Sequence, residues 1–200
     1  MAGCQHDIVT PFTTGLAELE PDIVPEPTGP YTETLVTDVE TPDYIHVYGR
    51  GFILADLTDV WPTTMDPEAL VAKCTTTDQT VVDDNEPDFE FSFIAKYEVD
   101  DLLTVKWQDA WRFGVLDGDD DAPERAMIKH QKIEGSSFIK KSEGTIELTP
   151  SLDDPDVTEY AVVEHLNSVG GSSDTVLKGV QHTYDSLVAV AHGQPIPPCP

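Results

Sequence analysis

The chain has 200 residues, 39% of them hydrophobic, which is enough for one domain with a sizeable core. No apolar run reaches the length of a transmembrane helix. Against 38 acidic residues stand 11 Lys and Arg, a formal net charge of -27 that would repel nucleic acid over the whole molecule and argues against it as a partner. The same acidity is compatible with a high-salt habitat, with binding of cations or basic partners, or with a very soluble exported protein.

Residues 1–43 differ in composition from the rest of the chain. They hold six prolines and nine acidic residues, contain no Lys or Arg, and sustain neither a helical nor a strand period. We therefore predict an acidic, proline-rich N-terminal arm over 1–43. Phe12, Leu16 and Leu19 are apolar residues that could pin part of this arm onto the domain.

The first residues, Met-Ala-Gly-Cys, resemble the end of a bacterial lipoprotein signal, in which small residues precede the lipidated cysteine. The basic and apolar regions of such a signal are missing, which fits a trimmed chain to which Met1 was added. The resemblance implies lipidation of Cys4 and a place in the cell envelope, as a periplasmic or outer-membrane lipoprotein. The alternative is an ordinary thiol and a cytoplasmic protein. If Cys4 is acylated, Cys74 and Cys199 become the candidate disulfide pair.

From Tyr44 the sequence becomes regular. The stretch "YIHVYGRGFIL" combines β-branched and aromatic residues with two glycines, which predicts a first strand with a bend or bulge. Asp56 then offers an N-cap oxygen to a short helix that we expect Pro62 to stop. Asp66, followed by Pro67 at the first helical position, begins a second short helix.

Alternating apolar and polar residues dominate the next part of the chain. The segments "FEFSFIAKYEV" and "TVKWQDAWRF" show this period, and "RAMIKHQKI", "SSFIKK", "GTIELTP" and "VTEYAVVEHL" follow at short spacing. An antiparallel meander is therefore favoured. From Ser172 to Gly193 the period becomes helical, with capping residues at both ends. We predict an α+β fold with an antiparallel sheet of six to seven strands and one long C-terminal helix.

Three segments resemble the START-like (SRPBCC, Bet v 1-like) superfamily, which includes polyketide cyclase/dehydrase-type proteins. The stretch "ILADLTDVWPTTMDPEAL" is similar to its entry signature, and "KIEGSSFIKKSEGTIELTP" and "VTEYAVVEHL" are similar to its closing strands. The resemblance covers 44–193 and leaves 194–200 as a C-terminal tail. It implies a helix-grip fold, in which the sheet curves around the long helix and leaves a cavity for a hydrophobic or amphipathic small molecule or lipid.

Strand alternation and the apolar stripe of the last helix supply candidate ligand-binding residues. They are Phe91, Phe93, Tyr97, Trp107, Asp109 and Trp111 on the strands, and Val180 and Tyr184 on the helix. Plain core packing is the alternative for each aromatic residue. Asp109 falls between two tryptophans, where burial would raise the pKa of its carboxyl group, unless it lies at the sheet rim or pairs with Arg112 or Lys106.

Two main hypotheses follow for function. One is a non-catalytic carrier or sensor of a hydrophobic small molecule; the other is a cyclase- or hydrolase-like enzyme with Asp109, His130 or Glu164 as acid or base. The sequence shows isolated titratable residues, which favours the carrier, whereas two polar side chains meeting inside the cavity would favour the enzyme. A third reading is an interaction or structural protein with a filled core.

The sequence predicts a monomer without a cofactor or metal, which reaches a membrane only through a lipid anchor. No two histidines have metal-ligand spacing, and the cysteines lack zinc or redox spacing. The acidic loops "DGDDDAPE" and "DDNEPD" lack the EF-hand order of ligands, so solvated turns are the favoured interpretation.

Overall fold

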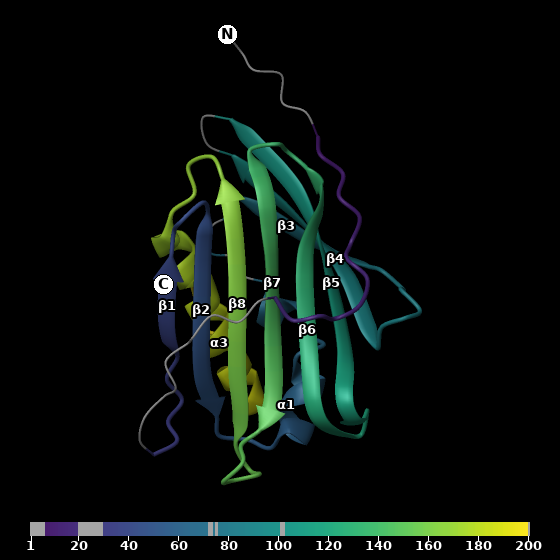
Figure 1. The fold of residues 1–200 in the computed structure, drawn as a ribbon, viewed down its shortest axis with the longest axis vertical. Helices are drawn as coiled ribbons and strands as arrows, with labels where there is room; N and C mark the ends of the chain where they lie inside the picture. The colour runs from purple at the N-terminus through teal and green to yellow at the C-terminus, as the bar shows by residue number, and fades with distance from the viewer. Residues whose placement is uncertain (1–6, 20–29, 72–73, 75, 101–102, 200) are drawn as a thin grey trace.

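One antiparallel sheet of eight strands forms the body of the protein (Figure 1). The computed structural model describes residues 7–19, 30–71, 74, 76–100 and 103–199. Cys4 lies outside these residues, so its lipidation stays a prediction. The sheet order is β1-β2-β8-β7-β6-β5-β4-β3. The strands are β1 Val36–Glu40, β2 Ile45–Ile53, β3 Asp78–Asp83, β4 Phe91–Asp100, β5 Thr104–Asp119, β6 Ala122–Gly135, β7 Ile139–Pro150 and β8 Thr158–Ser168.

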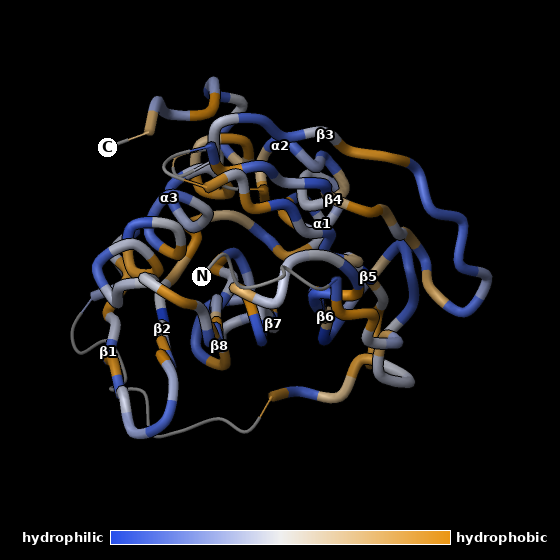
Figure 2. The backbone as a smooth tube through the Cα atoms, turned by 90° about the horizontal axis from the view of Figure 1, so that it is seen from above, coloured by the Kyte–Doolittle hydropathy of each residue, from blue (hydrophilic) through white to orange (hydrophobic). Residues whose placement is uncertain are grey.

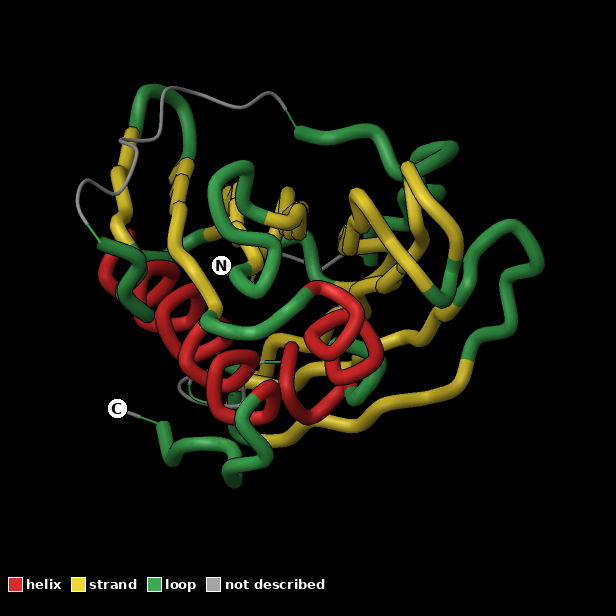
Figure 3. Tube along the Cα trace, turned by 90° about the horizontal axis from the view of Figure 1, so that it is seen from below, coloured by secondary structure: helices red, strands yellow, loops and turns green. Residues whose placement is uncertain are grey.

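The helices α1 (Leu57–Thr63), α2 (Pro67–Leu70) and α3 (Ser173–Ala191) lie together on the concave face of the sheet (Figure 3). Each begins where the sequence predicts, because Asp56, Asp66 and Ser172 accept hydrogen bonds from backbone N–H groups of the first turn. Pro62 does not stop α1, which continues to Thr63. No described helix is both long enough and apolar enough to span a bilayer.

The sheet has eight strands instead of the predicted six to seven, and the differences have physical reasons. The missed strands β1 and β3 are the two edges of the sheet, so each is short, pairs on one side and is rich in polar residues. β1 falls within 1–43, the range assigned to the arm. In the other direction, "SSFIKK" and "GTIELTP" belong to the single strand β7, which runs through Gly144.

Part of the N-terminal arm packs on the convex face of the sheet, opposite α3 (Figure 2). The Ile8 and Thr10 N–H groups donate to carbonyls at the end of β6, at 2.9 and 2.7 Å. The Gln131 side chain bonds the arm twice, to Thr13 N and to the Pro11 carbonyl. Phe12 lies edge-on to Phe89, with ring centroids 6.1 Å apart. The arm is therefore pinned to β5 and β6 along residues 7–19.

The core fills the space between the concave face and the helices. Its largest fully buried side chains include Trp61, Phe93, Phe113, Tyr160 and Tyr184. A disulfide between Cys74 and Cys199 holds the C-terminal tail. It is the pair predicted for the case that Cys4 is acylated. The hydrophobic stripe of α3 faces the sheet, as its period predicts. Side chains do not completely fill the space between α3 and the sheet, where a cavity remains.

Candidate ligand-binding site

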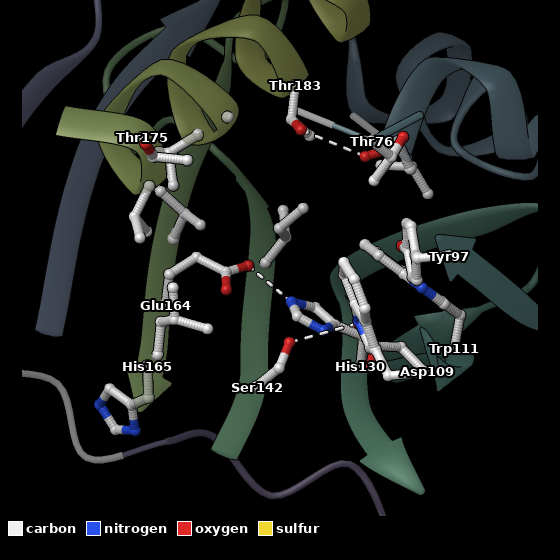
Figure 4. A pocket seen from close by; sticks show the side chains of 18 of the residues that line it. Thr76, Tyr97, Asp109, Trp111, His130, Ser142, Glu164, His165, Thr175 and Thr183 are labelled. Atoms are coloured by element: carbon white, nitrogen blue, oxygen red, sulfur yellow. Dashed lines mark hydrogen bonds and ion pairs between the residues drawn. The ribbon is translucent and has the colours of Figure 1, made fainter. Parts of the chain in front are cut away.

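A cavity of about 180 Å³ lies between α3 and the concave face of the sheet (Figure 4). Apolar side chains form one part of its wall: Leu70, Ile146, Val162, Leu166, Val176 and Val180. Aromatic side chains form another: Tyr97, Trp107, Trp111 and Tyr160. Polar side chains also line it, among them Asp109, His130, Ser142 and Glu164. The result is an amphipathic cavity, with its ionisable groups on the sheet side.

Five of the eight predicted ligand-binding residues line this cavity: Tyr97, Trp107, Asp109, Trp111 and Val180. The other three pack beside it. Phe93 stacks on Trp111 with ring centroids 5.6 Å apart, and Phe91 packs on Phe113 at 5.1 Å. Whether any of the eight contacts a ligand stays a prediction.

The Tyr184 side chain does not line the cavity, because it packs against β2 at Gly51, which has no side chain. Its side chain crosses to Gly51, where a Cβ atom would lie only 2.9 Å from Tyr184 Cε2. Its hydroxyl donates to the Phe52 carbonyl at 2.5 Å, and its ring meets the edge of Tyr160. A tyrosine one turn along α3 from Val180 therefore belongs to the core.

His130 and Glu164 form a close pair across the sheet, with Nε2 and Oε1 2.6 Å apart. In the strand register, both residues lie opposite Gly144 of the intervening strand β7. A Cβ atom at Gly144 would clash with the Glu164 carboxylate and with the His130 ring. Gly144 thus makes room for the pair. Its sequence signal is a lone glycine inside a β-rich stretch, which predicts a close approach of this kind as well as a strand end.

The pair favours a protonated imidazole. Burial of His130 opposes its charge, but the adjacent Glu164 carboxylate outweighs burial and raises the pKa of His130 above its ordinary value. The Trp111 ring stacks on the imidazole, with centroids 4.4 Å apart. Nδ1 of His130 has no hydrogen-bond partner among the described residues. The Nδ1–H group of the protonated imidazole therefore remains available as a hydrogen-bond donor.

Asp109 is buried, with 4% of its surface exposed, as the period of β5 predicts. Its Oδ2 accepts two long hydrogen bonds, from Trp107 Nε1 at 3.4 Å and from Ser142 Oγ at 3.3 Å. Its Oδ1 has no partner within the described part of the chain. Burial raises the pKa of Asp109 to about 6, although His130, Trp107 and Ser142 each lower it. The rim position and the pairing with Arg112 or Lys106 are excluded, since those two side chains pair with Asp84 and Glu98.

His165 belongs to the opposite face of β8, and Figure 4 shows its ring directed away from the other labelled side chains. Its Nδ1 lies 3.0 Å from Glu143, which also pairs with Lys141 at 2.6 Å. Burial raises the pKa of Glu143, but these two partners outweigh it and hold that pKa at about 2. His165 is therefore part of a polar cluster with Glu143 and Lys141 on the convex face.

Comparisons with known proteins concern the fold. No protein-family model matches the chain, and neither does any curated protein. Similar solved structures include an aromatase/cyclase from Streptomyces, a protein from Thermus thermophilus, and the lipid transfer and protein localization domain of human StarD13. The aromatase/cyclase is 12% identical, with 74% of this chain and 93% of that chain covered and a TM-score of 0.46. The Thermus protein is 17% identical, with 74% and 94% covered and a TM-score of 0.47. The StarD13 domain is 11% identical, with 82% and 86% covered and a TM-score of 0.49.

The topology decides the fold. An antiparallel sheet curves around a long C-terminal helix, and two short helices follow the first long strand. This arrangement is the predicted helix-grip fold. Within the helix-grip cavity, two pairs of polar side chains lie within hydrogen-bond reach, His130 with Glu164 and Ser142 with Asp109. Such pairs can transfer protons to or from a bound molecule.

A second cluster of ligand-type side chains lies at the end of the helix-grip domain. Cys74, His182 and Cys199 bring their ligand atoms within 4.8 Å of one another. The two sulfur atoms are joined in the disulfide, however, and metals bind thiolates. This arrangement is a covalent closure of the tail and does not offer a metal site in the oxidised protein.

Proposed function

We propose that the protein binds a small amphipathic molecule in the cavity between α3 and the sheet. The observation that supports this most is the buried Asp109 carboxylate, which faces an apolar and aromatic space with one oxygen unpaired among the described groups. Buried polar atoms normally have partners, so the site is complete only with water or a ligand group beside that oxygen.

The size of the cavity sets the size of the ligand and the strength of binding. An engineered apolar cavity of about 150 Å³ holds a benzene molecule, so about 180 Å³ suits a body slightly larger than one aromatic ring. Enclosing about 200 Å² of apolar surface at ~25 cal/mol/Å² contributes about 5 kcal/mol before association costs. We expect dissociation constants on the order of 0.1–1 mM.

Use as a carrier or sensor is the simplest form of this function. Catalysis in the same cavity is the second candidate, and it is favoured by the His130–Glu164 pair together with the Asp109 carboxyl, whose pKa of about 6 suits proton transfer near neutral pH. Incubating the protein with a candidate amphipathic molecule and then analysing that molecule by mass spectrometry separates the two: a carrier returns it unchanged, whereas an enzyme converts it.

Val180→Trp tests the cavity. Val180 lines it from α3, so an indole there fills the space, and we expect binding to be lost while the cooperative thermal unfolding transition is kept. Tryptophan fluorescence on titration with small aromatic ligands is the measurement. Val169→Trp is the matched control, because Val169 is 65% exposed. If the core is filled instead, Val180→Trp will lower the free energy of unfolding by about 1–3 kcal/mol, and neither variant will differ from the parent in binding.

A place in the cell envelope stays a proposal that rests on the Ala-Gly-Cys sequence alone. Replacement of Cys4 by Ser should release the protein from the membrane fraction of its host if the anchor exists. Recovery of the unchanged parent chain with soluble proteins would contradict it.

A further inference from the structure

The ionisable groups of the cavity leave one negative charge without a counter-charge. Asp109, His130 and Glu164 line the cavity. The His130 imidazolium and the Glu164 carboxylate are 2.6 Å apart and neutralise each other. The lining tyrosines, Tyr97 and Tyr160, are kept uncharged because burial raises their pKa values well above the ordinary range. The remaining charge is the Asp109 carboxylate, of which Oδ1 has no described hydrogen-bond partner.

The basic side chains nearest to Asp109 are committed elsewhere. Lys132 lies opposite Asp109 in the register of β5 and β6 and interacts with it electrostatically. Its ammonium nevertheless donates to three carbonyls of the β6–β7 connection, those of Gly135, Ser136 and Ile139, at 3.2, 2.9 and 2.6 Å. Arg112 pairs with Asp84 at 2.7 Å. In the described part of the chain, no Lys or Arg lines the cavity.

The walls around the carboxylate suit a cation as well as an apolar body. Trp107, Trp111 and Tyr97 line the same space. Trp111 is stacked between Phe93 and His130, and Tyr97 stacks on Trp107, so these rings offer apolar surface to the body of a ligand. A ligand carboxylate or phosphate would meet Asp109 and Glu164, and the one cationic group described in the lining, the His130 imidazolium, already pairs with Glu164. Burying a further anion next to a buried anion is strongly unfavourable.

We infer that the ligand is a cationic amphiphile: an amine on an aromatic or short aliphatic body, bound with its ammonium group at Asp109 Oδ1 and its apolar part between the tryptophans and Val180. This inference rests on the proposed binding function and names the class of ligand for it.

Three probes of one shape and different charge test the inference. 2-Phenylethylamine, 2-phenylethanol and phenylacetate are titrated into the protein at pH 7.5 and about 0.15 M salt, where exposed charges are screened beyond about 8 Å. We expect the amine to bind at least tenfold more tightly than the alcohol, and the carboxylate not to bind. Asp109→Asn should weaken the amine at least tenfold and change the affinity for the alcohol less than threefold.

A matched control separates the cavity from the general acidity of the protein. Asp119→Asn makes the same change of charge at an exposed residue and should leave all three affinities unchanged. Tighter binding of the alcohol or the carboxylate than of the amine, lost in Val180→Trp, would overturn the cationic ligand and leave the binding function intact. Binding of none of the probes, or binding unaffected by Val180→Trp, would overturn both.

Discussion

Asp109 destabilises the folded protein at neutral pH while the cavity is empty. Burial moves its pKa from 3.8 to about 6, so the folded state binds a proton more tightly than the unfolded state. At about 1.4 kcal/mol per pKa unit, ionised Asp109 costs about 3 kcal/mol of folding free energy above pH 6. Proteins retain such a group where it serves a site, which agrees with a binding role for this carboxylate.

Asp109→Asn should remove that cost and its pH dependence. Because the folded-state pKa is the higher one, the free energy of unfolding of the parent falls as pH rises from about 4 to about 6 and then levels off. In Asp109→Asn this part of the fall is absent, and we expect the variant to be about 1–3 kcal/mol more stable than the parent at pH 7.5. Urea unfolding at pH 5 and pH 7.5 measures the difference. A variant less stable than the parent at pH 7.5 would contradict the burial of the charge.

Site residues on the same strand can be predicted from the sequence, whereas contacts between residues on different strands cannot. Trp107, Asp109 and Trp111 share one face because a strand repeats every two residues, so their convergence follows from sequence alone. The His130–Glu164 pair depends instead on the register of three strands and on the missing side chain of Gly144. The spacing of residues in the sequence does not determine this register.

At the scale of elements, the arm from residue 7 to residue 19 acts as a cover for two basic side chains. Arg112 and Lys129 lie opposite each other on β5 and β6. The Arg112 guanidinium lies 5.1 Å from the ring centroid of Phe12, and Lys129 donates to the Ala17 carbonyl at 2.9 Å. Burial beneath the arm lowers the pKa of Lys129. The arm thus belongs to the folded domain along this stretch.

Phe12→Ala should loosen the arm. Phe12 is half-buried, so the loss of its packing on Phe89 and Arg112 should lower the free energy of unfolding by about 1–2 kcal/mol, less than a fully buried phenylalanine would. Hydrogen exchange of the Ile8 and Thr10 amides should accelerate at the same time. Val9→Ala is the control, since Val9 is 75% exposed. Unchanged exchange in Phe12→Ala would mean that the backbone hydrogen bonds alone hold the arm.

The elements that sequence reasoning found are those with a strong period, namely the long central strands and α3. The edge strands β1 and β3 were missed because one side of each faces solvent and their side chains are mostly polar. The sequence predicts a break at Gly144 between "SSFIKK" and "GTIELTP", but β7 continues through it. Propensity and period describe a strand that is covered on both sides better than one at an edge.

At the scale of the whole molecule, the Cys74–Cys199 disulfide joins residues 125 positions apart. A loop of this length should stabilise the folded chain by about 4–5 kcal/mol, chiefly by restricting the unfolded state. Cys199→Ser should therefore lower the free energy of unfolding by several kcal/mol in denaturant titrations, and Cys4→Ser, which leaves the pair intact, should not. Equal stability of the two variants would show that the tail is held without the covalent bond.

The acidic residues on the two edge strands affect how two copies of the chain can associate. β1 and β3 end the sheet, and each carries acidic residues, Asp38 and Glu40 on one and Asp78 and Asp83 on the other. Two copies that joined edge to edge would bring these carboxylates together, so we expect repulsion to oppose that contact although Val81 and Val82 of β3 are exposed. As the pH approaches the isoelectric point of about 4.1, this repulsion weakens, and we expect association through the edges to limit solubility in acid.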